Sequence, residues 1–459
     1  MAPRLVRTPV RPPITMAVIH GSPSRSARSL RFALWRRLFA AGTLVRRALL
    51  GESVVLPLGF EPGESVPAEV VAYFADSPSR FYQLTQWLPV LERLSERHPV
   101  LLVVREPETY YGLEELTSLR RVLLPQFAQL TDFYAQNDYR VCLYVNNASR
   151  NFQSLSHQTM LHVHISHGES DKISMVSNQA KAYDRVFVAG EAAIRRHRAA
   201  LIGFDERKLV PVGRPQLDLL LPPALPPSDR RTVLYAPTWE GENTANNYTS
   251  VDLFGESIAQ AVLSLPSMRF VYKPHPRLAV SALPDVRSAH ERISGLVERA
   301  RTADPAAGHR VALEEDILAV IPCADAMVTD VSSVGPDFLY LATEKPLFVT
   351  DRRNDRRQLA LDAPVTGGAD VIDERSVAFL AATLSARLEH DEHRDARERL
   401  RRHYFGDVAV GESTRRFIEA VSRVAAERDA LLARRSAASS PDATGNGIPV
   451  GQGVVGDDE

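Results

Sequence analysis

The chain has 459 residues, 44% of them apolar and 24% charged, which allows two large globular domains and excludes a disordered or fibrous protein. Its two cysteines, Cys142 and Cys323, are too few for a disulfide framework and are typical of a reducing cytosol. No uninterrupted apolar stretch approaches the roughly 18 residues of a membrane-spanning helix, which argues against an integral membrane protein.

The first 50 residues form a basic arm. They contain ten arginines and no lysine, aspartate or glutamate, whereas the remaining 45 basic and 56 acidic residues give the rest of the chain a net charge of −11. From about Arg28 to Leu50, apolar residues recur at steps of three and four, which predicts an amphipathic helix. We expect residues 25–50 to bind an anionic membrane surface, with a helix packed on the protein body as the alternative. A transit peptide would share this composition, and no nucleic-acid motif accompanies the arginines.

Between residues 51 and 435, short apolar runs alternate with helical stretches. This alternation predicts βαβ units and mostly parallel sheets. The segment 221–229 has four prolines in nine residues and is typical of a linker. We therefore expect an α/β protein with two Rossmann-like, doubly wound domains, 51–220 and 230–435, that face a cleft. The low-complexity tail, 436–459, is expected to be disordered.

The first motif with chemical potential is HISHGESDK, residues 164–172. Gly168 would allow a tight turn after a strand and leave His167 exposed at the sheet edge, with Lys172 further along the loop. Histidine has an ordinary pKa of about 6.5 and can accept a proton from a hydroxyl at cellular pH. We expect His162 and His164 to be structural, because their spacing with His167 spans a strand and its turn and does not indicate a metal site.

Two further motifs lie on either side of the linker. The GRPQLD stretch, residues 213–218, carries Arg214 and is best interpreted as a loop that enters the hinge. The VLYAPTWEG stretch, residues 233–241, leads from a strand into a polar loop. In that loop Thr238 would present its hydroxyl or its backbone N–H to a phosphate, while Trp239 is equally consistent with packing.

The VYKPHPR stretch, residues 271–277, places one imidazole between two cations. Pro274 and Pro276 fix the backbone on both sides of His275, which lies between Lys273 and Arg277. We expect these cations to lower the pKa of His275 while no phosphate is bound. With a diphosphate present, the imidazole would act as a hydrogen-bond donor or an acid to the departing oxygen.

A serine pair completes the predicted anion site. Within residues 324–351, Asp330 ends a strand, and Ser332 and Ser333 precede a helical stretch. Free N–H groups and the helix dipole favour an anion at such a position, although simple N-capping would use the same serines. Together with the cations of 271–277, these residues predict a pyrophosphate site that uses fixed donors and no metal.

In this order, the motifs resemble the CDP-glycerol glycerophosphotransferase family. The resemblance rests on the HG pair with a lysine five residues after the histidine, on YAPTW, on KPHP and on TDxSS followed by DF, and it covers about residues 70–425. It implies a GT-B fold and a membrane-associated cytosolic enzyme. That enzyme would transfer glycerol phosphate from CDP-glycerol to a hydroxyl of a lipid-linked or polymeric acceptor, as in teichoic acid synthesis, with no cofactor.

By position, the resemblance implies His167 as the base for the acceptor hydroxyl and His275 as a contact of the donor phosphates. The expected donor-binding residues are Lys273, Arg277, Thr238, Asp330, Ser332 and Ser333, and the expected acceptor-side residues are Gly168, Lys172 and Arg214. The pair Asp337 and Phe338 is expected to serve helix packing. The chain departs from the family pattern at Ser166, Glu169, Ser170, Asp171 and Val331, and the first four of these departures lie on the acceptor side.

Two other functions fit the same features. A GT-B glycosyltransferase or epimerase would use a UDP-sugar and, in the first case, release UDP, whereas phosphotransfer releases CMP. A non-catalytic assembly factor at the membrane would keep the basic arm but would not need His167, His275 and the serine pair.

Overall fold

The computed structural model describes residues 58–438 except 62, 77, 173–174 and 220. The chain divides into two compact units, Met1–Val54 and Val55–Glu459, and all described residues belong to the second. The predicted amphipathic helix of the arm and most of the predicted disordered tail lie outside the described residues. Within them, no helix is both long and apolar enough to cross a bilayer.

The first half contains a parallel sheet of seven strands in the order β3-β2-β1-β4-β5-β6-β7. Its central strands are apolar along their whole length and buried on both faces, as expected for parallel strands covered by helices. The strands are β1 (Val70–Phe74), β2 (Val100–Val104), β3 (Arg120–Leu123), β4 (Val141–Tyr144), β5 (Leu161–His164), β6 (Arg185–Val188) and β7 (Leu209–Pro211). The α-helices are α2 (Tyr82–Thr85), α3 (Leu88–Ser95), α4 (Pro107–Gly112), α5 (Phe127–Ala135), α6 (Asn151–Leu155) and α7 (Glu191–Ala200).

The second half contains a parallel sheet of six strands in the order β10-β9-β8-β11-β12-β13. In both sheets the first strand lies inside the sheet and the strand order reverses beside it, which is the switch point where doubly wound folds bind ligands. The strands are β8 (Arg231–Ala236), β9 (Met268–Tyr272), β10 (Arg310–Val311), β11 (Ala326–Thr329), β12 (Leu347–Thr350) and β13 (Asp370–Ile372). The α-helices are α8 (Gly255–Leu263), α9 (Pro284–Ala303), α10 (Ile317–Val320), α11 (Val334–Leu341), α12 (Arg356–Asp362), α13 (Leu380–Glu389), α14 (Arg394–Phe405) and α15 (Glu412–Ala438).

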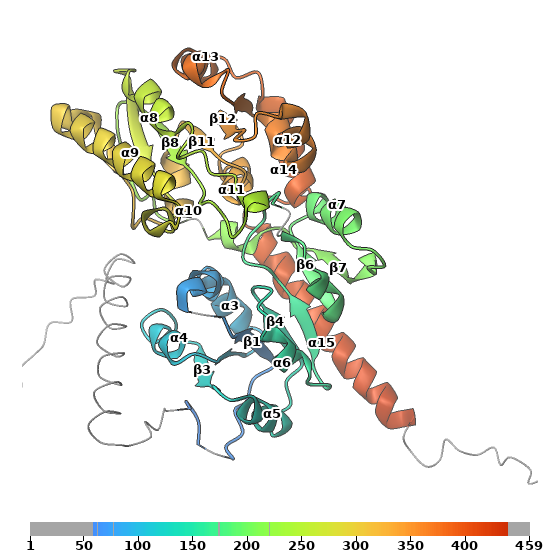
Figure 1. Cartoon of the computed structure of the whole chain (residues 1–459). Helices are drawn as coiled ribbons and strands as arrows, with labels where there is room; N and C mark the ends of the chain where they lie inside the picture. The colour runs from blue at the N-terminus through green and yellow to red at the C-terminus, as the bar shows by residue number, and fades with distance from the viewer. Residues whose placement is uncertain (1–57, 62, 77, 173–174, 220, 439–459) are drawn as a thin grey trace, which may run out of the picture. The chain divides into compact units, whose positions relative to one another are not determined.

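The long helix α15 follows the second sheet in the chain but packs on the first. It contacts β4 and β5, and Figure 1 draws it in red near the label of β4. Phe417 anchors it, with ring centroids 5.1 Å from Trp87 and 5.9 Å from Phe187. The helix therefore ties the end of the second half to the core of the first.

The GRPQLD stretch joins the two halves at the start of α15. The carboxylate of Asp218, in the short 3-10 helix η5 (Pro215–Asp218), accepts the backbone N–H groups of Gly411 at 2.9 Å and Thr414 at 2.6 Å. Gly213 has a φ of +77°, and a Cβ there would lie 2.2 Å from the Ser413 hydroxyl oxygen. Only glycine meets both conditions, so Gly213 allows the close approach of the GRPQLD stretch to Ser413 in α15.

Candidate active site

The predicted site residues gather where the carboxyl ends of the two sheets meet. Gly168, beyond β5, lies so close to the second half that a Cβ on it would be 3.6 Å from the Cβ of Ser333 and 3.3 Å from Arg214 Nη1. Lys172 Nζ donates to Thr238 Oγ1 at 3.1 Å. These contacts bring the HISHGESDK loop of the first half against YAPTW and the serine pair of the second.

The turn after β5 is made by Ser166, not by Gly168 as the sequence pattern suggested. Ser166 has a φ of +53°, in the left-handed region that non-glycine residues rarely occupy, whereas Gly168 has no positive φ. The carbonyl of Ser166 accepts the indole N–H of Trp87 at 2.6 Å, which holds the strained turn in place. Gly168 is required for a different reason, because Arg214 and Ser333 leave little room for a side chain there.

This turn presents the imidazole of His167. The ring packs edge-on against Tyr82, with centroids 6.1 Å apart. Burial and the nearby guanidinium of Arg214 lower the pKa of His167 to about 4, while a hydrogen bond with the backbone of Val145 acts in the opposite direction. The ring is therefore neutral at cellular pH, and the nitrogen not engaged with Val145 is able to accept a proton.

The loop between His167 and Lys172 is anchored on helices α7 and α14. Glu169 and Asp171 both pair with Arg196 of α7, and the hydroxyl of Tyr404 in α14 donates to Asp171. Burial raises the pKa of Asp171 to about 6 and lowers the pKa of Arg196 to about 10. Two of the four acceptor-side departures from the family pattern thus form a buried anchor for the loop.

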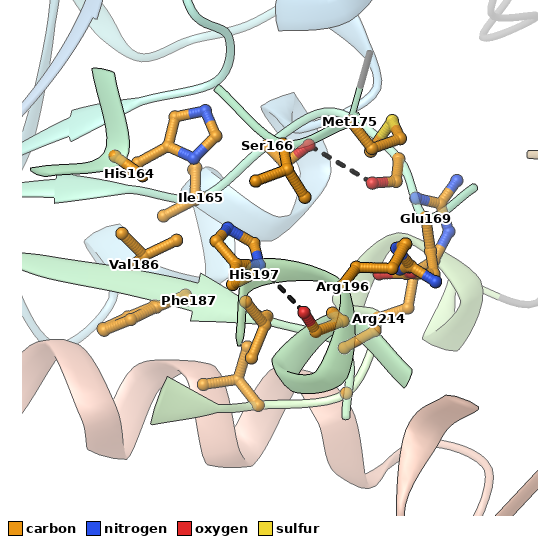
Figure 2. A pocket seen from close by; sticks show the side chains of 18 of the residues that line it. His164, Ile165, Ser166, Glu169, Met175, Val186, Phe187, Arg196, His197 and Arg214 are labelled. Atoms are coloured by element: carbon orange, nitrogen blue, oxygen red, sulfur yellow. Dashed lines mark hydrogen bonds and ion pairs between the residues drawn. The ribbon is translucent and has the colours of Figure 1, made fainter. Parts of the chain in front are cut away.

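A small cavity of about 50 Å³ lies beside this anchor. Figure 2 shows His164, Ser166, Arg196, His197 and Arg214 among the side chains around it. Its volume suits one or two water molecules but not a nucleotide.

His275 in the second half is fixed by a backbone hydrogen bond, a side-chain hydrogen bond and a ring contact. Its backbone N–H donates to the Pro237 carbonyl at 3.3 Å, and its Nδ1 accepts the backbone N–H of Arg277 at 3.2 Å. The ring stacks on Trp239 with centroids 6.1 Å apart, and the Arg277 guanidinium lies 3.9 Å from the same indole centroid. Because Nδ1 is an acceptor, the neutral ring carries its proton on Nε2.

The pKa of His275 is lowered to about 3, mainly by burial and further by the charges of Lys172, Arg277 and Lys273. The direction agrees with the expectation from the two flanking cations, but burial and the cation from the other half were not foreseen. The imidazole is thus neutral and is able to donate a hydrogen bond through Nε2.

Asp330 supports, from inside the protein, the polar loop that follows β8, residues 237–241, which we call the predicted phosphate loop. Its carboxylate accepts the backbone N–H of Thr238 at 2.7 Å and the Thr350 hydroxyl at 2.6 Å, and burial raises its pKa. Since both oxygens are engaged, Asp330 holds Thr238 in position. Thr238 is itself buried, and its hydroxyl oxygen accepts the ammonium of Lys172 at 3.1 Å.

The serine pair begins α11 as expected, but the two residues differ. The hydroxyl oxygen of Ser332 accepts the Val334 N–H at 3.3 Å, whereas Ser333 forms no side-chain cap. The helix N-terminus therefore keeps N–H groups and the Ser333 hydroxyl near Gly168, an arrangement suited to an anion.

The two cations that flank His275, Lys273 and Arg277, have different surroundings. Lys273 is buried, and its ammonium donates to the Leu313 carbonyl at 3.4 Å, near Glu315 and Asp316, whose charges raise its pKa against the larger lowering by burial. Arg277 is exposed and stacks on Trp239. Lys172 is the predicted cation that reaches the predicted phosphate loop from the first half, through its hydrogen bond to Thr238.

Arg214, predicted on the acceptor side, forms a buried ion pair across the two halves. Its Nε lies 2.7 Å from Asp337 Oδ1, its Nη2 lies 3.1 Å from Oδ2, and Nη1 donates to the His167 carbonyl at 3.5 Å. Asp337, expected only to serve helix packing, is thus the partner that fixes Arg214 beneath His167. Among the described residues, no three His, Cys, Asp or Glu side chains gather in a possible metal site.

Comparison with known structures supports the fold. The UDP-GlcNAc 2-epimerase from Neisseria meningitidis bound to UDP-GlcNAc is similar at a TM-score of 0.51 and 13% identity, over 77% of this chain and 100% of that chain. The wall teichoic acid polymerase TagF has a TM-score of 0.49 and 12% identity, over 88% of this chain and 98% of that chain. The first likeness confirms the predicted α/β class with two Rossmann-like sheets of GT-B type.

The family assignment comes from the sequence. No curated protein matches the chain. The model of the family described as CDP-glycerol:poly(glycerophosphate) glycerophosphotransferase matches residues 140–423, which is more than half of the chain and spans all four motifs. The chain therefore belongs to the CDP-glycerol:poly(glycerophosphate) glycerophosphotransferase family and is a transferase.

Proposed function

We propose that this transferase moves glycerol phosphate from CDP-glycerol to a hydroxyl of a lipid-linked or polymeric acceptor in the synthesis of a teichoic-acid-like cell-wall polymer. The observation that carries the proposal is the hydrogen bond of 3.1 Å between Lys172 and Thr238. Through it, the loop of His167 meets the predicted phosphate loop beside His275, which supports one site shared by the proposed base and the proposed phosphate ligands.

In the proposed reaction, the free ring nitrogen of His167 takes the proton of the acceptor hydroxyl. The hydroxyl oxygen attacks the phosphorus that carries glycerol, and the bond from that phosphorus to the bridging oxygen breaks. CMP leaves with the bonding electron pair, and the acceptor gains a phosphodiester. Nε2–H of His275 donates to the donor phosphates, and the N-terminus of α11 adds further donors. We propose that these fixed donors replace a metal, so that CMP release continues in a chelator.

The acceptor and the membrane role rest on the family and on the basic arm. We propose that residues 25–50 hold the enzyme at the inner face of the cell membrane, where a lipid-linked acceptor would be presented. Sedimentation with anionic vesicles tests this: the full chain should co-sediment and a chain lacking residues 1–50 should not. Equal binding of both, or of neither, would refute a membrane role for the arm.

The reaction is tested by nucleotide release with CDP-glycerol, CDP-ribitol and UDP-GlcNAc, each with a glycerol phosphate oligomer or a membrane extract as acceptor. We expect CMP from CDP-glycerol, and we expect His275→Ala to abolish most of it. UDP release from UDP-GlcNAc alone would instead establish a sugar transferase, and preference for CDP-ribitol would correct the transferred alcohol.

A titration of His275 tests its role as a neutral donor. Because its pKa lies at about 3 in the free protein, the ring should stay neutral, with its proton on Nε2, from pH 8 down to pH 5. Bound CDP should raise the pKa, since two phosphates stabilise the imidazolium. NMR of protein labelled with ¹⁵N-histidine, assigned with His275→Gln, measures both the charge and the tautomer. A signal that titrates near pH 6.5 without CDP would contradict the burial argument.

A further inference from the structure

Lys172 lies in the first half of the sequence, but its ammonium contacts residues of the second half. It ends the loop that carries His167, yet its ammonium donates to Thr238 Oγ1 at 3.1 Å and lies 5.8 Å from the ring centroid of Tyr248. Its charge also contributes to the lowered pKa of His275. The ammonium therefore faces the predicted phosphate loop, whereas the ring of His167 packs against Tyr82 of the first half.

Among the described residues, this ammonium contacts the Thr238 hydroxyl and the Tyr248 ring, and it forms no ion pair with a carboxylate. Asp330 is the carboxylate that acts on it electrostatically, but the oxygens of Asp330 already accept from Thr238 and Thr350. Burial lowers the pKa of Lys172 to about 8, as expected for a partly desolvated cation. Such a cation gains strongly from an anionic ligand, because a charge-assisted hydrogen bond offsets the lost hydration.

The position of Lys172 is built into the loop. Two residues of the same loop, Glu169 and Asp171, are fixed on Arg196, and Asp171 also accepts the hydroxyl of Tyr404. Immediately before them, Gly168 packs against Ser333 at the start of α11. The loop is therefore anchored along its length, with Lys172 directed at Thr238 and the helix N-terminus close by.

We propose that Lys172 is a donor-site residue, whose ammonium binds the diphosphate of the nucleotide donor from across the two halves. The sequence pattern had placed this lysine on the acceptor side. The proposal rests on the proposed function only for the identity of the nucleotide, since the same contact would hold any nucleoside diphosphate group.

Calorimetric titration of the full-length protein with CDP and with UDP tests the proposal. Lys172→Gln keeps a polar side chain only one atom shorter but removes the charge, and Lys172→Ala removes the charge and the polar group. Each should weaken binding of the preferred nucleotide by roughly 10- to 100-fold, the loss expected for one charge-assisted hydrogen bond. The slope of log Kd against log salt concentration should also become shallower, which a merely structural change would not cause. Lys181→Ala, at an exposed lysine of the same half, is the matched control and should bind as the wild type does.

The outcomes separate this proposal from the proposed function. Weaker CDP binding by both Lys172 variants supports the role of Lys172 and the proposed donor. If the wild type prefers UDP and the variants bind UDP weakly, the proposed donor is wrong but the role of Lys172 stands. Variants that bind nucleotide as tightly as the wild type, and change only the KM for the acceptor, would return Lys172 to the acceptor side. Failure of the wild type to bind either nucleotide would overturn the proposal.

Discussion

Replacing His167 by alanine should lower kcat by about 10²- to 10⁴-fold, the usual contribution of a general base. The imidazole is neutral at cellular pH, because burial and Arg214 lower its pKa to about 4. It also follows a strained turn at Ser166 that Trp87 holds in place, so its direction is fixed. The affinity for CDP should stay unchanged, because the substitution alters none of the proposed diphosphate ligands, which are Lys172, His275 and the N-terminus of α11. Steady-state CMP release and calorimetry measure the two quantities.

A second substitution distinguishes a base from a positioning residue. Glutamine at position 167 is able to donate to the backbone of Val145 as the imidazole does, but it does not accept a proton at neutral pH. His167→Gln should therefore be as inactive as His167→Ala, while His390→Ala, at an exposed histidine after α13, should be fully active. Substantial activity in His167→Gln would show that the ring only shapes the site and that the base lies elsewhere.

The fold was predictable because its signals are local. Parallel strands buried on both faces read as short apolar runs, and both sheets follow the alternation of such runs with helical stretches. The return of α15 to the first sheet was not predictable. Its docking depends on Phe417 meeting Trp87 and on Asp218 meeting Gly411 and Thr414, and such pairs leave no periodic trace in one sequence.

The motifs located the site but did not assign every role. Histidines and serines at strand ends were visible because their residue types suggest chemistry wherever a strand meets a loop. The partners of those residues were not visible: Asp337, 123 positions from Arg214, looked like helix packing. Asp330 looked like a phosphate ligand until its oxygens were found on Thr238 and Thr350. The role of such a residue depends on which polar or charged groups it contacts, and only the three-dimensional structure identifies those contacts.

Replacing Arg214 by methionine should be among the most destabilising single changes in the protein. Arg214 and Asp337 are both buried, and they pair through two contacts across the two halves. Removing one partner of a buried pair leaves an uncompensated charge and typically costs about 3–5 kcal/mol. Urea unfolding at pH 7 should show a clearly lowered midpoint. The matched control is Arg207→Met, which removes an exposed pair with Asp205 and should leave the midpoint unchanged.

The dependence of this loss on pH identifies its cause. Burial raises the pKa of Asp337 to about 6 even beside Arg214. The wild type therefore loses stability as the pH rises from the pKa of Asp337 in the unfolded chain to its pKa of about 6 in the folded protein. Above that pH this contribution to stability no longer changes. Without the guanidinium the pKa of Asp337 rises again, and the folded variant continues to lose stability above pH 6. The difference between variant and wild type should therefore be larger at pH 8 than at pH 5.

The double variant Arg214→Met with Asp337→Leu should recover much of the stability, because no buried charge remains unpaired. It should not recover the full kcat, since Arg214 also donates to the carbonyl of His167. Recovery of both would mean that the pair serves only to join the two halves. Recovery of stability alone would mean that the same guanidinium that joins the halves also sets the position of the base, which is the role that its place between Asp337 and His167 predicts.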